Sequence, residues 1–132
     1  MSRASEGLSD ERGSAVAEFV MVTALLTVLT LSVLQLGLAL LIRNTVLDAA
    51  AEGARYGSLV DNTAVEGIAL TRDLITTAIG PAYARDVSAS SGTYLGHPAL
   101  IVTVRAPLPL IGLIGVDRGL EVSGHAPVET LD

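Results

Sequence analysis

Apolar side chains in this chain are concentrated in one continuous run near the N-terminus. Residues 14–42 read SAVAEFVMVTALLTVLTLSVLQLGLALLI, and Glu18 is the only ionisable side chain among them. At about 1.5 Å per residue, a helix of this length exceeds the roughly 30 Å of hydrocarbon in a bilayer. The rest of the chain is too short to cover such a helix on every side. The pattern therefore predicts a transmembrane helix over residues 14–42.

The run is too long for a cleavable secretory signal. Such signals have an apolar region of about 7–15 residues that is followed by a cleavage site of small residues. Here Arg43 and Asn44 follow the run, and no such site is present. We therefore expect the apolar segment to stay in the mature protein.

The segment that follows is still helical in character. Residues 43–59 are rich in alanine and contain no proline, so we expect the helix to continue through them beyond the membrane. Small residues recur at every fourth position on two of its faces, which lets another backbone approach closely. Two interpretations stay open, docking against the chain's own C-terminal part or packing against another subunit, and both can hold. The faces consist of Ala49, Gly53 and Gly57, and of Ala50, Ala54 and Ser58.

Residues 60–132 carry the pattern of a small α+β domain. Thr63 and Glu66 have the spacing of a capping box, and Gly80-Pro81 ends the helix that begins there. The apolar stripe expected along this helix consists of Val65, Ile68, Ala69, Ile75 and Ile79.

Strands follow the second helix. Residues 83–89 form a weak strand, whereas 99–105 and 120–126 are stronger ones, and serine, glycine and proline between 90 and 98 indicate a turn. We expect an antiparallel sheet of about three strands, packed with the second helix onto the end of the long helix. The fold class is α+β and membrane-anchored, with residues 14–42, 43–59 and 60–132 as its successive parts.

An apolar segment rich in proline and glycine separates the last two strands. Residues 107–116 contain five leucine and isoleucine side chains besides prolines, glycines and one valine, in a stretch unsuited to regular structure. An exposed apolar loop marks a partner or membrane contact. Alternatively, the loop folds back over the domain and adds its apolar side chains to the core, because so small a domain needs every apolar residue.

Composition excludes several classes of function. The chain of 132 residues has a mean hydropathy of +0.56, no cysteine and a net charge of −6. A nucleic-acid binder needs a basic face, and thiol chemistry and disulfides need cysteine. His97 and His125 have no second ligand pattern beside them, and phosphate-binding loops and G-x-S-x-G are missing. We expect neither enzymatic activity nor a cofactor or metal.

A further motif lies at the start of the apolar run. Residues 1–12 are polar, and we expect them to be disordered. They precede Gly13, and Glu18 stands five positions after that glycine. This arrangement resembles the cleavage site of a type IV prepilin, and more closely that of the TadE-like minor pilins (pseudopilins) of tight-adherence (Flp) pilus systems. The resemblance implies that a prepilin peptidase removes a leader, residues 1–13, by cutting between Gly13 and Ser14. It also implies that Glu18 pairs with the free amine of a neighbouring subunit.

A second motif supports the same resemblance. Residues 50–56, AAEGARY, are similar to the A-x-E-G-A-R segment of TadE-like proteins, and they stand shortly after the membrane helix as the family's segment does. The two motifs together cover about residues 12–58. The second motif favours tight adherence over the alternative of a type II secretion pseudopilin.

The resemblance implies a structural protein of pilus assembly in the bacterial cytoplasmic membrane. Its expected partners are the prepilin peptidase, other pilins, pilus assembly membrane proteins and lipid. Basic residues do not orient the helix, because Arg3 and Arg12 precede it and Arg43 and Arg55 follow it. The resemblance implies a cytoplasmic N-terminus and an extracytoplasmic C-terminal domain. An alternative is an uncleaved signal-anchor protein with an extracytoplasmic binding domain.

Overall fold

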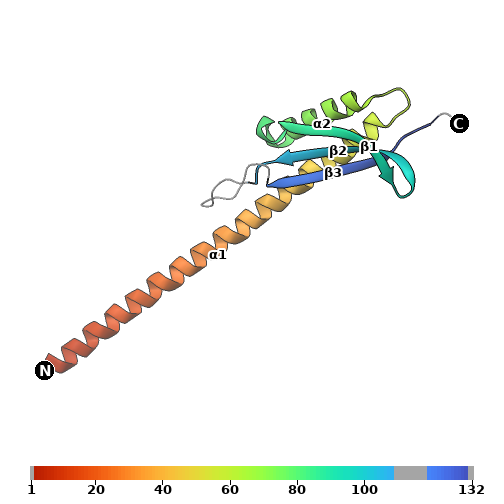
Figure 1. The fold of residues 1–132 in the computed structure, drawn as a ribbon. Coiled ribbons are helices and arrows are strands. Elements are labelled where there is room, and N and C mark those ends of the chain that lie inside the picture. Colours follow the sequence, from red (N-terminus) through yellow and green to blue (C-terminus); the bar gives the residue numbers. More distant parts are fainter. Residues whose placement is uncertain (1, 109–118, 131–132) are drawn as a thin grey trace. The chain divides into compact units, whose positions relative to one another are not determined.

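A computed structural model describes residues 2–108 and 119–130 of the chain (Figure 1). Its elements are, in order, helix α1 (Ser2–Gly57), helix α2 (Ala64–Ile79), a single 3-10 turn η1 (Pro81–Tyr83), and strands β1 (Asp86–Tyr94), β2 (His97–Ala106) and β3 (Leu120–Pro127). The strands form one antiparallel sheet in the order β1-β2-β3. The predicted α+β class, with a long N-terminal helix, one further helix and three strands, is confirmed.

The chain divides into two compact units, one up to Leu36 and one from Gly37 onward. The first unit is the N-terminal part of α1. The helix begins at Ser2, so the expected disorder of residues 1–12 is not observed in the described part of that segment. Its physical reason is the composition of the segment, which contains alanine, leucine, arginine and glutamate and no proline to stop a helix.

From Asp10 onward α1 is long and apolar enough to cross a membrane. From Val16 to Leu41 its large apolar side chains are exposed rather than packed, and those of Phe19 and Met21 are 71% exposed. Leaving so much contiguous apolar surface in water is unfavourable. The helix therefore requires an apolar environment outside the chain, which a bilayer provides.

The core of the second unit is made by α1, α2 and the sheet. Ile42 and Val46 of α1 are buried together with Ile75 of α2 and with Val102 and Val104 of β2. Helix α1 ends at Gly57, two residues before the predicted end. A C-terminal difference of this size is common, because helix ends are closed by local hydrogen bonds rather than by a sharp signal.

Helix α2 has the predicted capping box. The Thr63 side chain accepts a hydrogen bond from the Glu66 N–H at 3.4 Å, and the Glu66 carboxylate accepts one from the Thr63 N–H at 3.3 Å. Gly80, at φ 104°, ends the helix as predicted. The caps at both ends give partners to backbone groups that this 16-residue helix would otherwise leave unpaired.

The predicted apolar stripe on α2 is only partly correct. Ile75 is buried, and Ile68 and Ile79 pack against the core, but Val65 is 73% exposed and Ala69 is also exposed. Where α2 comes closest to α1, it carries the small residues Gly67 and Thr71 instead of large apolar ones. A search for large apolar side chains at helical spacing therefore assigns part of the stripe to the wrong face.

We expect Thr63→Ala to lower the free energy of unfolding of the second unit by about 1 kcal/mol, because it removes the side-chain acceptor of the cap. Chemical denaturation of the full chain in detergent measures this. Thr77→Ala, at an exposed position inside the same helix, is the matched control and should be neutral or slightly stabilising. An equal response of the two variants would contradict the role of the cap.

Strand β1 differs from its predicted bounds. It runs from Asp86 to Tyr94 rather than over 83–89, and residues 90–94, expected in a turn, lie within it. The serines and glycine there indicate a turn by composition, but pairing with β2 decides their conformation: Gly92 pairs with Ala99. The turn is shorter, with Leu95 and Gly96 at φ 53° and 80°, as in two-residue hairpins. Strands β2 and β3 extend their predictions by one or two residues.

The apolar segment 107–116 is described only at its start. Leu108 is partly buried and packs against the core, as a segment folded back onto the domain requires. Residues 109–116 lie outside the described residues, so the two interpretations of this segment both remain predictions.

Candidate functional site

The residues of the expected cleavage site lie on the exposed surface of α1. Gly13, Ser14 and Glu18 are all exposed, and a Cβ added at Gly13 would meet no atom within 4 Å. Five helical residues rise about 7.5 Å, so Gly13 and Glu18 are separated by less than two turns. No described part of the chain shields them, and a second protein can therefore reach this stretch.

The first small-residue face of α1 packs directly against α2. Gly53 and Gly57 face Gly67: a Cβ on Gly53 would lie 2.7 Å from the Gly67 carbonyl oxygen and would overlap the Thr71 hydroxyl. A Cβ on Gly57 would lie 3.2 Å from the Gly67 Cα. The two helices are thus in backbone contact, which only residues without a side chain permit.

Thr71 closes this helix crossing with its hydroxyl group. The hydroxyl donates to the Gly67 carbonyl at 2.8 Å within α2, and the Ala49 carbonyl of α1 lies 3.4 Å away as a second acceptor. Thr71 is fully buried, so its hydroxyl needs a partner inside the protein. The crossing provides one.

The second small-residue face packs against the sheet. Ala50 and Ala54 are fully buried, and a Cβ on Gly124 of β3 would collide with the backbone of Ala50 and Ala51. Both small-residue faces of α1 are therefore covered by the chain's own α2 and β3. This is the first of the two interpretations that the sequence left open.

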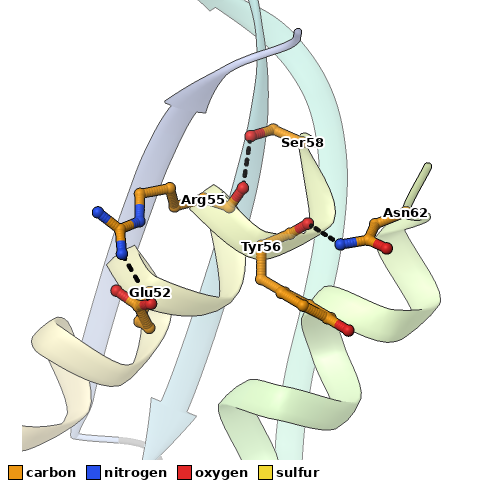
Figure 2. Close-up of polar contacts among 5 residues, drawn as sticks. All are labelled: Glu52, Arg55, Tyr56, Ser58 and Asn62. Atoms are coloured by element: carbon orange, nitrogen blue, oxygen red, sulfur yellow. Dashed lines mark hydrogen bonds and ion pairs between the residues drawn. The ribbon is translucent and has the colours of Figure 1, made fainter. Parts of the chain in front are cut away.

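The remaining residues of the A-x-E-G-A-R segment point outward. Figure 2 shows the ion pair between Glu52 and Arg55, with 3.1 Å between Oε1 and the guanidinium nitrogen. The side chains are 48% and 73% exposed, so the pair adds little stability. Gly53 and Ala54 of this segment therefore permit close packing against α2 and the sheet, and Glu52 and Arg55 make the solvent-exposed side of the helix polar.

Side chains beyond the segment close the end of α1. The Ser58 hydroxyl donates to the Arg55 carbonyl at 2.8 Å, and the Asn62 amide donates to the Tyr56 carbonyl at 2.9 Å (Figure 2). The Glu129 N–H donates to the Ser58 carbonyl at 2.9 Å. These bonds satisfy carbonyl groups that a helix end leaves without partners.

Sequence reasoning missed the partners of the small-residue faces. Gly67, Thr71 and Gly124 are as essential to the packing as the alanines and glycines of α1. A glycine inside a helix, such as Gly67, and one inside a strand, such as Gly124, each indicate close approach of a backbone. That signal could have found two of the three.

The histidines do not form a metal site. His97 and His125 are exposed, and the His125 ring stacks on Tyr94 with 4.9 Å between ring centroids. Within residues 2–108 and 119–130, no group of three or more histidine, cysteine, aspartate or glutamate side chains could hold a metal ion.

One comparison with known proteins gave a match. Residues 13–55 match the family model described as TadE-like protein, and this match covers about a third of the chain. It begins at Gly13 and ends at Arg55, so it includes both motifs singled out in the sequence. Neither the search of curated proteins nor that of solved structures found a match.

Proposed function

Because the chain is a TadE-like protein over its residues 13–55, we propose that it is a minor pilin, or pseudopilin, of a tight-adherence pilus. Membership of this family implies association with Tad pili, and the family is not known to be enzymatic. The observation that carries the proposal is the position of Gly13, the first matched residue, directly before a helix long enough to cross a membrane. The same match favours Tad pili over a type II secretion pseudopilus.

The proposed role is structural. The prepilin peptidase cuts after Gly13, and Ser14 becomes the N-terminal residue. Helix α1 offers the peptidase an exposed glycine, which lowers helix stability by about 1 kcal/mol and eases local unwinding into an extended conformation. The chain is thus the substrate of an enzyme and needs neither a metal nor a cofactor for its role.

Glu18 is proposed to guide assembly. A carboxylate inside the hydrocarbon costs about 2.5–3.5 kcal/mol at mid-helix and less near the interface. The free amine of Ser14 in a neighbouring subunit supplies the opposite charge that removes most of this cost. The exposed apolar side chains of α1 then pack between subunits, as they pack against lipid before assembly.

The proposed topology is a single span with a cytoplasmic N-terminus and an extracytoplasmic second unit. The proposed partners are the prepilin peptidase, other pilins, membrane proteins of pilus assembly and lipid. Nucleic acid is not among them, because the net charge of −6 opposes binding to a polyanion.

The test is to determine the N-terminal residue of the membrane-extracted protein from cells with and without the peptidase. Edman sequencing and intact mass should show Ser14 first, with residues 14–132 retained, only where the peptidase is present. An intact leader in both strains would contradict the proposal. It would favour the alternative of an uncleaved signal-anchor protein that binds a partner through its extracytoplasmic domain.

We expect Glu18→Ala to leave insertion and cleavage intact and to reduce the number of pili at least about tenfold, since the neighbouring amine then loses its counter-charge in apolar surroundings. Electron microscopy of cells carrying the variant counts the pili. Glu18→Asp, which keeps the charge, should retain more of them. Normal pilus numbers in Glu18→Ala would refute the pairing.

A further inference from the structure

Among the residues that the structure describes, strand β3 is an edge strand of the sheet. Within the described residues it pairs with β2 alone. The Val128 N–H donates to the Pro98 carbonyl at 3.0 Å, so Val128 and Pro98 are a hydrogen-bonded pair. In an antiparallel sheet such pairs alternate with non-hydrogen-bonded pairs, whose N–H and C=O groups point away from the neighbouring strand. Every second residue of β3 therefore directs its N–H and C=O to the free edge: Glu121, Ser123 and His125.

This edge lacks the usual protection against pairing. Edge strands are commonly blunted by lysine, proline or a bulge. Strand β3 pairs with β2 without interruption from Leu120 to Pro127, contains no lysine, and has its proline only as the last residue. The backbone groups of its free side are therefore ready to accept another strand.

Helix α1 packs against β3 and forms a groove with it. At Gly124 the helix backbone lies against β3 without any intervening side chain. Beyond that contact lies an open groove of about 490 Å³. Its lining residues are Asp48, Ala51, Glu52 and Arg55 of α1, and His125, Ala126 and Pro127 of β3.

The charge of the groove selects its occupant. Asp48, Glu52 and Arg55 line its helical wall, and because Arg55 pairs with Glu52 at 3.1 Å, the wall keeps one net negative charge, at Asp48. The chain's own edge strands, β1 and β3, contain no lysine or arginine, so a second copy cannot supply a complementary charge through them.

We propose that the β3 edge binds an extended segment of another pilus assembly protein as a fourth strand, with a basic side chain placed over Asp48. This rests on the proposed function for the identity of the partner. Main-chain hydrogen bonds to Glu121, Ser123 and His125 give affinity, and the acidic groove wall gives the preference for a basic residue.

The test uses two synthetic peptides, TVTRTVT and TVTETVT, titrated into the ¹⁵N-labelled full chain in detergent micelles. The arginine peptide should protect the amides of Glu121, Ser123 and His125 from hydrogen exchange. It should bind at least about tenfold more tightly than the glutamate peptide, because like charges repel in the groove. Equal binding of the two peptides would overturn the proposal.

Matched proline variants locate the site. Ser123→Pro removes an outward N–H from β3 and should abolish binding, whereas Ser91→Pro, at the corresponding free edge of β1, should leave it unchanged. The variant Asp48→Asn leaves both strands and the Glu52–Arg55 ion pair intact and should remove the preference for arginine. Binding that survives Ser123→Pro but is lost in Ser91→Pro would place the site on the wrong edge and overturn the proposal.

Two other outcomes are distinguishable. Concentration-dependent protection of the same three amides without peptide would show that a second copy occupies the edge, and it would overturn the assignment to a basic partner. Peptide binding does not depend on leader removal. A positive titration together with an intact leader in cells would therefore support the strand-addition site and refute only the proposed pilin function.

Discussion

Gly53→Ala should destabilise the second unit by about 2–3 kcal/mol, although alanine is the stronger helix former. The added methyl group has no room: it would overlap the Thr71 hydroxyl and lie 2.7 Å from the Gly67 carbonyl oxygen. Helices α1 and α2 must then separate, which weakens the buried hydrogen bond of Thr71 and opens the core. Hydrogen exchange of the β2 amides in the full chain, measured in detergent, reports this loss of stability.

Gly37→Ala is the matched control. It makes the same substitution in the same helix, but nothing lies within 4 Å of the added Cβ. Stability should therefore stay the same or rise by up to about 1 kcal/mol from helix propensity alone. If the β2 amides exchanged equally fast in the two variants, the close packing of α1 against α2 at Gly53 would be contradicted.

Gly13→Leu should abolish removal of the leader. A side chain at this position obstructs the entry of an extended backbone into a narrow protease site, and leucine also holds the helix together by close to 1 kcal/mol relative to glycine. Intact mass of the membrane-extracted protein would show the full chain alone, with its N-terminus at Met1 or Ser2.

Gly7→Leu, at the other glycine of the leader, is the control and should be processed normally. The same mass measurement covers both variants. A product beginning at Ser14 from Gly13→Leu would remove Gly13 from the cleavage site. Failure of both variants would instead indicate that helix stability in the leader, rather than one position, governs processing.

The elements set by local chemistry could be predicted from the sequence. The run from Ser14 to Ile42 has one ionisable side chain, and Thr63, Glu66 and Gly80 define the ends of α2 through bonds to neighbouring backbone groups. Periodicity and capping act over a few residues, so the sequence carries them directly. The family motifs likewise lie within one continuous helix.

The elements whose structure depends on residues distant in the chain could not be predicted from the sequence. Residues 90–92 become strand because β2 pairs with them, and Ser91 pairs with Leu100, nine positions away. The buried face of α2 is decided by the approach of Gly53, fourteen residues before Gly67. Small residues score poorly in any search for an apolar stripe, yet at this crossing their lack of a side chain is what the packing requires.

Because α1 belongs to both units, cleavage of this helix has a consequence for the second unit. Ile42 and Val46 belong both to the long helix and to the core that covers Val102 and Val104. A protease that cut the helix between Ile42 and Gly57 would not release an intact second unit, because the fragment would lack part of its own interior. The anchor and the domain it carries thus persist or are degraded together, and any soluble form must retain the apolar turns that begin at Gly37.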